Sequence, residues 1–324
     1  MTQKERDQQT GRLFINKVKV GDRAYSMWES KFGCRVLEDY YEGKQWVEQD
    51  NYSPYVLNLF YSTIGIKEGS LLFSKANFQL SPKPWGMDYQ PEVAIQKVTM
   101  ATDMLNSIVS DKTLNLGPYA KLCLLDSMFR FGLMEVGFSD EWTQNPRANK
   151  PIPKMMFDEN AEPDEYNDPI EIDPVSHIFI KRILPETFRV SSNYKPTLDA
   201  MDWYGYYEWW NRGDITNSDL RNTDDIEPCY VSSDEDIAAP DTGYTERNAL
   251  KVWHVWCNRT RMKYIIRDED GMVMYNEPFP RRCVFDLRFA HRTKSWYPIP
   301  VTFNWKSPQD EQNETKEQLR ATRR

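Results

Sequence analysis

Carboxylates are the most numerous side chains in this sequence that could perform chemistry, and many of them gather in two segments. Residues 158–174 hold eight Asp and Glu residues with no Lys or Arg, and residues 214–241 hold nine acids against Arg221 alone. Converging carboxylates can bind the paired cations of a metal-dependent nuclease. These acids stand among Pro, Asn and Asp residues, which favour loops. We therefore expect two solvated acidic inserts, and the nuclease stays an alternative.

Other residue types that catalyse reactions or bind metals are few. The sequence has three His and five Cys residues, with no G-x-S-x-G motif, no Gly-rich phosphate loop and no C-x-x-C pair. Scattered cysteines of this kind predict reduced, mostly buried thiols rather than a zinc site or disulfides. His254 alternates with aromatic and aliphatic residues in an expected strand, where a packed or edge histidine is the common outcome. We predict no catalytic residue, no metal and no cofactor.

Aromatic side chains cluster between residues 203 and 210. A strand of this kind could stack on sugars, which leaves a carbohydrate-binding module as a second alternative. Alternation along a strand turns about half of its side chains inward, so core and subunit packing is the simpler explanation. Because Tyr and Trp are enriched at protein interfaces, the candidates for a subunit interface are Trp203, Tyr206, Trp209 and Trp210.

Composition excludes several classes of protein. The chain has 324 residues, a net charge of -8 and 40% hydrophobic residues, enough for one large domain or two ordinary ones. No run of 18 apolar residues occurs, so the sequence predicts no membrane-spanning helix. The segment Met1–Arg12 is polar and mixed in charge, so we expect no secretory signal. An ordinary secreted, membrane or zinc protein does not fit this sequence.

Hydrophobic periodicity predicts helices first and strands later. Spacings of three and four indicate helices at 23–46, from about 54 to 72, at 91–111 and at 118–133, with a short strand at 77–84. Alternation then predicts strands at 134–138, 177–183, 188–190, 203–210, 251–257, 262–266 and 272–275. We expect the first helix to turn Glu29 and Glu38 toward water and to end at Gly43. The fold class predicted is α+β.

A long polar helix is predicted from Ser307 to the end of the chain. Ser307 and Pro308 are typical of an N-cap and a first helical turn, and Leu319 is the only sizeable aliphatic residue after them. The core of a monomer cannot hold so polar a helix, so we expect it to pack against copies of itself or to fray. It stops at Arg324 without a capping residue, as if the chain were interrupted within an element.

Four sets of residues, in order from residue 37 to the end, form a further pattern. They are Leu37–Trp46 (LEDYYEGKQW); Asn58–Gly69; Arg182–Val190 (RILPETFRV) with Asp199–Trp203 beyond it; and Pro278–Pro280, Trp296–Pro300 and Pro308–Asn313 (PQDEQN). This pattern resembles the portal protein of tailed double-stranded DNA bacteriophages, of the podophage type. The last motif departs from the family's P-x-Q-x-E-x-N, because its acid comes one place early.

The resemblance implies a structural protein of the virion without catalysis of its own. Portals form a ring, usually of twelve subunits, at one vertex of the capsid, and assemble in the host cytoplasm. Double-stranded DNA passes through the ring during packaging and ejection, and terminase, capsid and tail adaptor proteins bind it. No membrane partner is implied.

The resemblance also implies a division of the chain. Residues 1–306 would form the wing, with helices at about 23–133 and a β-rich part at about 134–306, and residues 307–324 would begin the stem helix. The family's clip, second stem helix and crown would follow Arg324.

The last part of the chain carries the candidates for contact with DNA. Residues 281–324 contain ten Lys and Arg residues against five acids, a net charge of +5. A basic helix can contact phosphates, but acids near its start and bases near its end also match the helix dipole, and both explanations stay open. The candidates to line a channel or contact a neighbouring stem helix are Lys316, Arg320, Arg323 and Arg324, of which the first two lie four residues apart on one face.

Overall fold

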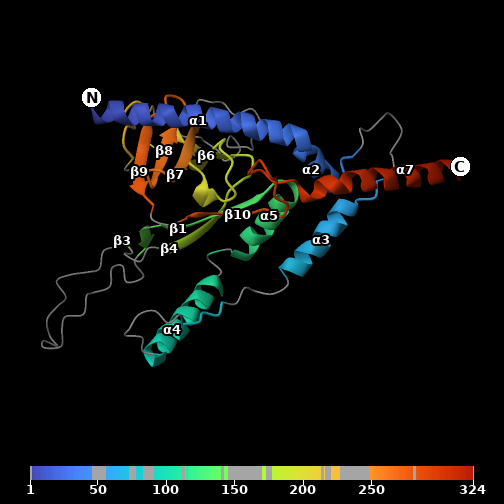
Figure 1. The fold of residues 1–324 in the computed structure, drawn as a ribbon, viewed down its shortest axis with the longest axis horizontal. Helices are drawn as coiled ribbons and strands as arrows, with labels where there is room; N and C mark the ends of the chain where they lie inside the picture. Colours follow the sequence, from blue (N-terminus) through green and yellow to red (C-terminus); the bar gives the residue numbers. More distant parts are fainter. Residues whose placement is uncertain are drawn as a thin grey trace. The chain divides into compact units, whose positions relative to one another are not determined.

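The computed structural model of the protein is mixed helix and antiparallel sheet, which confirms the α+β class (Figure 1). It describes residues 2–45, 56–72, 78–82, 91–110, 114, 116–139, 142–144, 170–172, 177–212, 215, 220–226, 249–279 and 282–323. The chain forms two compact units that interleave along the sequence. The larger comprises Met1–Lys75, Gly117–Met134 and Arg182–Arg324, and the smaller comprises Ala76–Leu116 and Glu135–Lys181.

Two helices open the larger unit. Helix α1 (Gln3–Phe32) begins with a capping box between Thr2 and Glu5, and helix α2 (Cys34–Glu42) ends at Gly43 as expected. Between them Gly33 has a φ of 59°, in the left-handed region that favours glycine, so the helix breaks there. The predicted helix at 23–46 is helical as expected, but its start and its continuity were wrong, since α1 begins at Gln3 and the helix breaks at Gly33. The start was missed because the first turns are rich in polar residues.

A five-stranded antiparallel sheet forms the centre of the larger unit. Its strand order is β5-β6-β7-β8-β9. The strands are β5 (Phe188–Val190), β6 (Trp203–Asn211), β7 (Ala249–Cys257), β8 (Met262–Arg267) and β9 (Val273–Pro278). Figure 1 shows α1 lying along this sheet. The approach is close, since a Cβ added to Gly11 would lie 1.9 Å from the carbonyl oxygen of Gly271.

Both faces of the sheet are buried. One face packs against Phe14, Ile15 and Val18 of α1 and contributes a cluster that includes Trp203, Trp253 and Val255. The other face contributes Tyr204, Tyr206 and Trp256 to a second cluster, which also holds Trp28, Phe131, Phe188, Trp296 and Tyr297. Since neighbouring residues of a strand point to opposite faces, the aromatic run of β6 supplies both clusters.

A third hydrophobic cluster joins three helices of the larger unit. Helix α3 (Leu59–Leu71) contributes Phe60 and Ile64, α5 (Leu116–Phe129) contributes Leu124 and Met128, and α2 contributes Leu37 and Tyr40. Helix α3 begins at Leu59 after an N-cap at Asn58; the predicted start at Ser53 and Pro54 lies outside the described residues. Strand β10 (Val284–Leu287) and the 3-10 turns η2 (Leu198–Ala200) and η4 (Val301–Trp305) complete the unit.

The smaller unit contains α4 (Pro91–Ser110), most of β1 (Gly132–Ser139) and β4 (His177–Arg182), which pair, and the short pair β2 (Trp142–Gln144) and β3 (Ile170–Ile172). The expected strand at 77–84 is wrong for residues 78–82. There the side chain of Asn106 bonds both backbone groups of Phe78, and Thr102 accepts from the N–H of Leu80, so helix side chains replace a strand partner.

The acidic inserts lie largely outside the described residues, and their described parts differ from simple loops. Residues 170–172 of the first insert form β3. In the second insert, Ile215 and Ile226 are 1% and 5% exposed and pack in one cluster with Leu250 and Met274. Apolar residues therefore hold this insert to the sheet at two points.

A buried arginine links the helices to the sheet region within the larger unit. Arg130, which follows α5, is 4% exposed and forms ion pairs with Glu29 of α1 (2.9 Å), Glu38 of α2 and Glu186 before β5 (3.0 Å). The expectation that Glu29 and Glu38 face only water was wrong. A buried guanidinium needs partners, and carboxylates on adjacent helices provide them.

Three carboxylates sharing one guanidinium leave an excess of negative charge. The pKa of Glu38 is raised to about 7: burial is the largest cause, and Glu186, Glu29 and Asp126 raise it further, while Arg130 opposes them. Asp126 itself is paired with Arg182 at 2.6 Å. An acid whose pKa is higher in the folded protein stabilises it at low pH and loses that effect as pH rises toward the folded value.

We predict that Glu38→Gln stabilises the protein at pH 8 but not at pH 4. Between these values the advantage of the variant should grow, since wild-type Glu38 must ionise in the folded state while Gln stays neutral and still accepts from Arg130. Urea unfolding of both proteins from pH 4 to pH 8 measures this difference. A difference in unfolding free energy between the two proteins that stays constant with pH would contradict the raised pKa of Glu38 in the folded protein.

Candidate functional site

The C-terminal helix is the element that carries the predicted functional cations, and its first turns are held by the same chain. Helix α7 (Lys306–Thr322) continues directly from η4, so its N-cap is Trp305 rather than Ser307. In Figure 1 its first turns lie next to α2, and the C-terminus marks its far end. Two amide side chains of this helix, Gln309 and Asn313, are each 1% exposed.

These two amides bond the backbone at the start of α3. The N–H of Leu59 donates to Oε1 of Gln309 and the N–H of Leu57 donates to Oδ1 of Asn313, both at 3.0 Å. Nε2 of Gln309 donates to the carbonyl oxygen of Leu57, and Nδ2 of Asn313 donates to Oε1 of Gln45. The first N–H groups of a helix lack partners within it. At the N-terminus of α3 the side chain of Asn58 accepts from the N–H of Tyr61, and Gln309 of α7 accepts from the N–H of Leu59.

Further contacts fix the same turns. The hydroxyl of Tyr40 in α2 donates to Oδ1 of Asp310 at 2.6 Å, and burial together with this bond raises the pKa of Tyr40. The ring of Trp305 meets Phe60 edge-on at 5.8 Å, and Nζ of Lys67 lies 4.7 Å from the ring centroid of Trp305. We define the α7 anchor as Tyr40, Gln45, Leu57, Leu59, Gln309, Asp310 and Asn313.

The α7 anchor corrects the prediction that this helix cannot be held within one chain. The sequence reasoning assigned every polar residue of the helix to solvent or to a neighbouring copy. Gln309 and Asn313 lie four residues apart and therefore on one face, and that spacing is the signal that was available. Hydrogen bonds, rather than apolar burial, supply the contact.

Beyond the α7 anchor the helix is exposed. Lys316, Arg320 and Arg323 are all exposed, and Arg320 lies 3.8 Å from Glu317; Arg324 lies outside the described residues. Leu319 on the same turns is 48% exposed. The candidate cations therefore line the part of α7 that follows its contact with α2 and α3, and they are accessible to a phosphate or to another chain.

The aromatic interface candidates have separate environments. Trp203 and Tyr206 are 4% and 3% exposed, so they belong to the core and not to a surface, since both faces of β6 are covered. Trp210 is half-buried and packs beside the cluster around Ile215, while Trp209 is 41% exposed. Of the four, Trp209 presents the most surface to a partner.

The histidine and the cysteines that could have served catalysis or metal binding are mostly buried in the described residues. His254 is buried, and its ring stacks on Tyr206 with centroids 4.9 Å apart, which confirms the packed histidine. Cys34, Cys123 and Cys257 are buried free thiols, Cys283 is half-buried, and Cys229 lies outside the described residues. In the described part of the chain, no group of three or more His, Cys, Asp and Glu residues could hold a metal ion. Within that part, no helix is long and apolar enough to cross a membrane.

Comparison with known proteins adds no relative. No protein-family model matches the chain, and no curated protein does.

We predict that Gln309→Ala lowers the free energy of unfolding by about 1 to 3 kcal/mol, since a buried amide that accepts from the N–H of Leu59 and donates to the carbonyl oxygen of Leu57 is lost. The matched control is Gln312→Ala in the same helix, where the side chain is exposed and the expected change is within about 0.5 kcal/mol. Urea unfolding gives both values, and amide exchange at Leu59 should accelerate only in Gln309→Ala. Equal effects of the two substitutions would contradict the role given to the buried amide.

Proposed function

We propose that this chain is a subunit of the ring-shaped portal at one vertex of a tailed bacteriophage capsid. It would act as a structural protein, with no catalysis of its own. The ring would conduct double-stranded DNA during packaging and ejection, and terminase, capsid and tail adaptor proteins would bind it. Residues up to about 306 would serve as the wing, and α7 would begin the stem.

The observation that carries this proposal is the convergence of the motifs that resemble portals. Gln45 belongs to the motif 37–46, Leu59 to the motif 58–69, and Gln309 and Asn313 to the motif 308–313, and all four are members of the α7 anchor. Residues 250 to 268 positions apart thus meet, through the side chains of Gln45, Gln309 and Asn313 and the backbone N–H of Leu59. This convergence supports a common role for the motifs, which chance similarity of single segments would not require.

A second link joins the motif 37–46 to the strand motif 182–190. Glu186 of the motif 182–190 and Glu38 of the motif 37–46 both bind Arg130. Within the larger unit, the motif 37–46 therefore takes part in both polar clusters: it contacts α7 through Gln45 and the strand motif through Arg130.

The exposed half of α7 supports a role in assembly. A helix whose last turns are exposed and carry mostly polar and charged residues gains little from solvent alone and is marginal in isolation. Neighbouring copies arranged around an axis would give each such helix partners of the same kind, with Lys316 and Arg320 facing a neighbour or the channel. The net charge of -8 suits a conduit that DNA slides through rather than one that binds it tightly.

We predict that Lys316→Glu with Arg320→Glu reduces assembly of the ring. The matched control is Lys19→Glu with Arg23→Glu, which makes the same change of charge at the same spacing on exposed positions of α1. Mass photometry of the purified proteins at equal concentration measures the fraction of subunits in multimers. The stem variant should lose multimers and the α1 control should keep them; equal assembly in both would contradict the role proposed for α7.

A further inference from the structure

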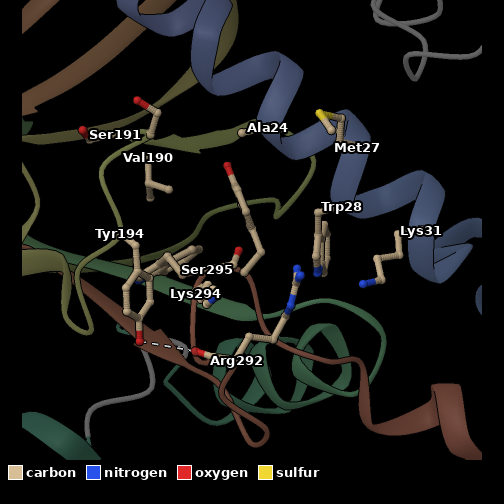
Figure 2. Close-up of a pocket in the computed structure, with 13 residues that line it drawn as sticks. Ala24, Met27, Trp28, Lys31, Val190, Ser191, Tyr194, Arg292, Lys294 and Ser295 are labelled. Atoms are coloured by element: carbon tan, nitrogen blue, oxygen red, sulfur yellow. Dashed lines mark hydrogen bonds between the residues drawn. The ribbon is translucent and has the colours of Figure 1, made fainter.

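A cavity of about 290 Å³ lies between the second half of α1 and two segments, one after β5 and one before η4, all within the larger unit (Figure 2). Its cationic lining residues are Lys31, Arg292 and Lys294. None of the 13 residues that line it is Asp or Glu. In a chain with 49 acids and 41 bases, three cations around one cavity without an acid are a local reversal of charge.

Neighbouring arginines, by contrast, are neutralised. Arg288 lies 2.6 Å from Asp286, and Arg189 pairs with Asp22 at 2.5 Å. Lys31, Arg292 and Lys294 form no ion pair with any carboxylate of the described residues. Coulomb repulsion among like charges that share a cavity falls when an anion enters, so the lining itself favours an anionic ligand.

The positions of the cations are compatible with one shared ligand. Nζ of Lys31 and Cζ of Arg292 lie 5.6 and 5.5 Å from the centroid of the same ring, Phe32. Figure 2 shows both side chains beside Trp28. The hydroxyl of Tyr194 donates to the carbonyl oxygen of Arg292 at 3.3 Å, which ties the two sides of the cavity together.

The other lining residues define the class of anion. Ser191, Ser192 and Ser295 add hydroxyl groups, so the cavity offers more donors than a single carboxylate can accept, and a phosphate has the additional oxygens. Tyr194 and Met27 add aromatic and apolar surface, since they are 40% and 75% exposed, while Trp28 is buried. The volume lies at the lower end of small-ligand pockets and exceeds what the phosphate alone requires.

We propose that this cavity binds a nucleoside phosphate, either free or as one unit of a nucleic-acid strand. The cations and hydroxyls hold the phosphate, and the aromatic surface contacts the nucleoside, the combination by which proteins bind single strands. The proposal does not depend on ring formation, since every residue in it belongs to one chain.

The test compares the wild-type protein with a variant that carries Lys31→Gln and Lys294→Gln, both at exposed positions. The matched control carries Lys19→Gln and Lys97→Gln, also exposed, with the same loss of charge. Isothermal titration uses adenosine 5′-monophosphate and inorganic phosphate, and fluorescence anisotropy uses a labelled oligothymidylate. Each removed cation should weaken nucleotide binding by roughly tenfold or more in the cavity variant, and the control should match the wild type.

Several outcomes distinguish the source of the ligand or overturn the proposal. Tighter binding of the oligonucleotide than of the nucleotide would support a strand, and equal binding would support a free nucleotide. Inorganic phosphate binding as tightly as the nucleotide would overturn the role of the aromatic surface. Equal binding by the wild type and the cavity variant, or binding of none of the probes at millimolar concentration, would overturn the site.

Discussion

The start of α3 and the first turns of α7 are joined by buried amides: Gln309 accepts from the N–H of Leu59 and Asn313 accepts from the N–H of Leu57. These bonds fix the first turns of α7 against α3. Loss of Asn313 leaves the N–H of Leu57 without this acceptor, which costs more than the loss of an ordinary surface contact. The position of the candidate cations on α7 follows from these bonds, since they come after the last anchored turn.

Buried polar contacts hold the helices of the larger unit in place, and aromatic packing holds its sheet. Around Arg130, carboxylates from α1, α2 and the segment before β5 share one guanidinium. Such a network stabilises one arrangement over others because each unpaired member would be costly. The aromatic clusters on both sides of the five-stranded sheet contribute most of the apolar burial, and they take Trp203 and Tyr206 out of consideration as surface residues.

Local patterns predicted much of the fold. The strands around Phe188, Trp203 and Lys251 follow from alternation, and α4 follows from its apolar spacing. Long-range polar contacts could not be predicted this way: nothing near Glu38 indicates that Arg130, 92 residues later, needs it. The buried amides of α7 were missed for the same reason, because a polar residue on a helix is normally assigned to solvent. The cations of α7 were predicted from charge alone. That they follow the last turn held by α2 and α3 could be seen only in the structure.

The proposed portal function rests on the meeting of four sequence motifs at two polar clusters and on a charged helix that continues beyond its own domain. Its central claim is that copies of this chain close into a ring. Electron microscopy of the purified wild-type chain in negative stain tests this claim most directly. We expect ring-shaped particles with a central hole and a mass many times the 38.4 kDa of one chain; only single subunits at micromolar concentration would contradict it.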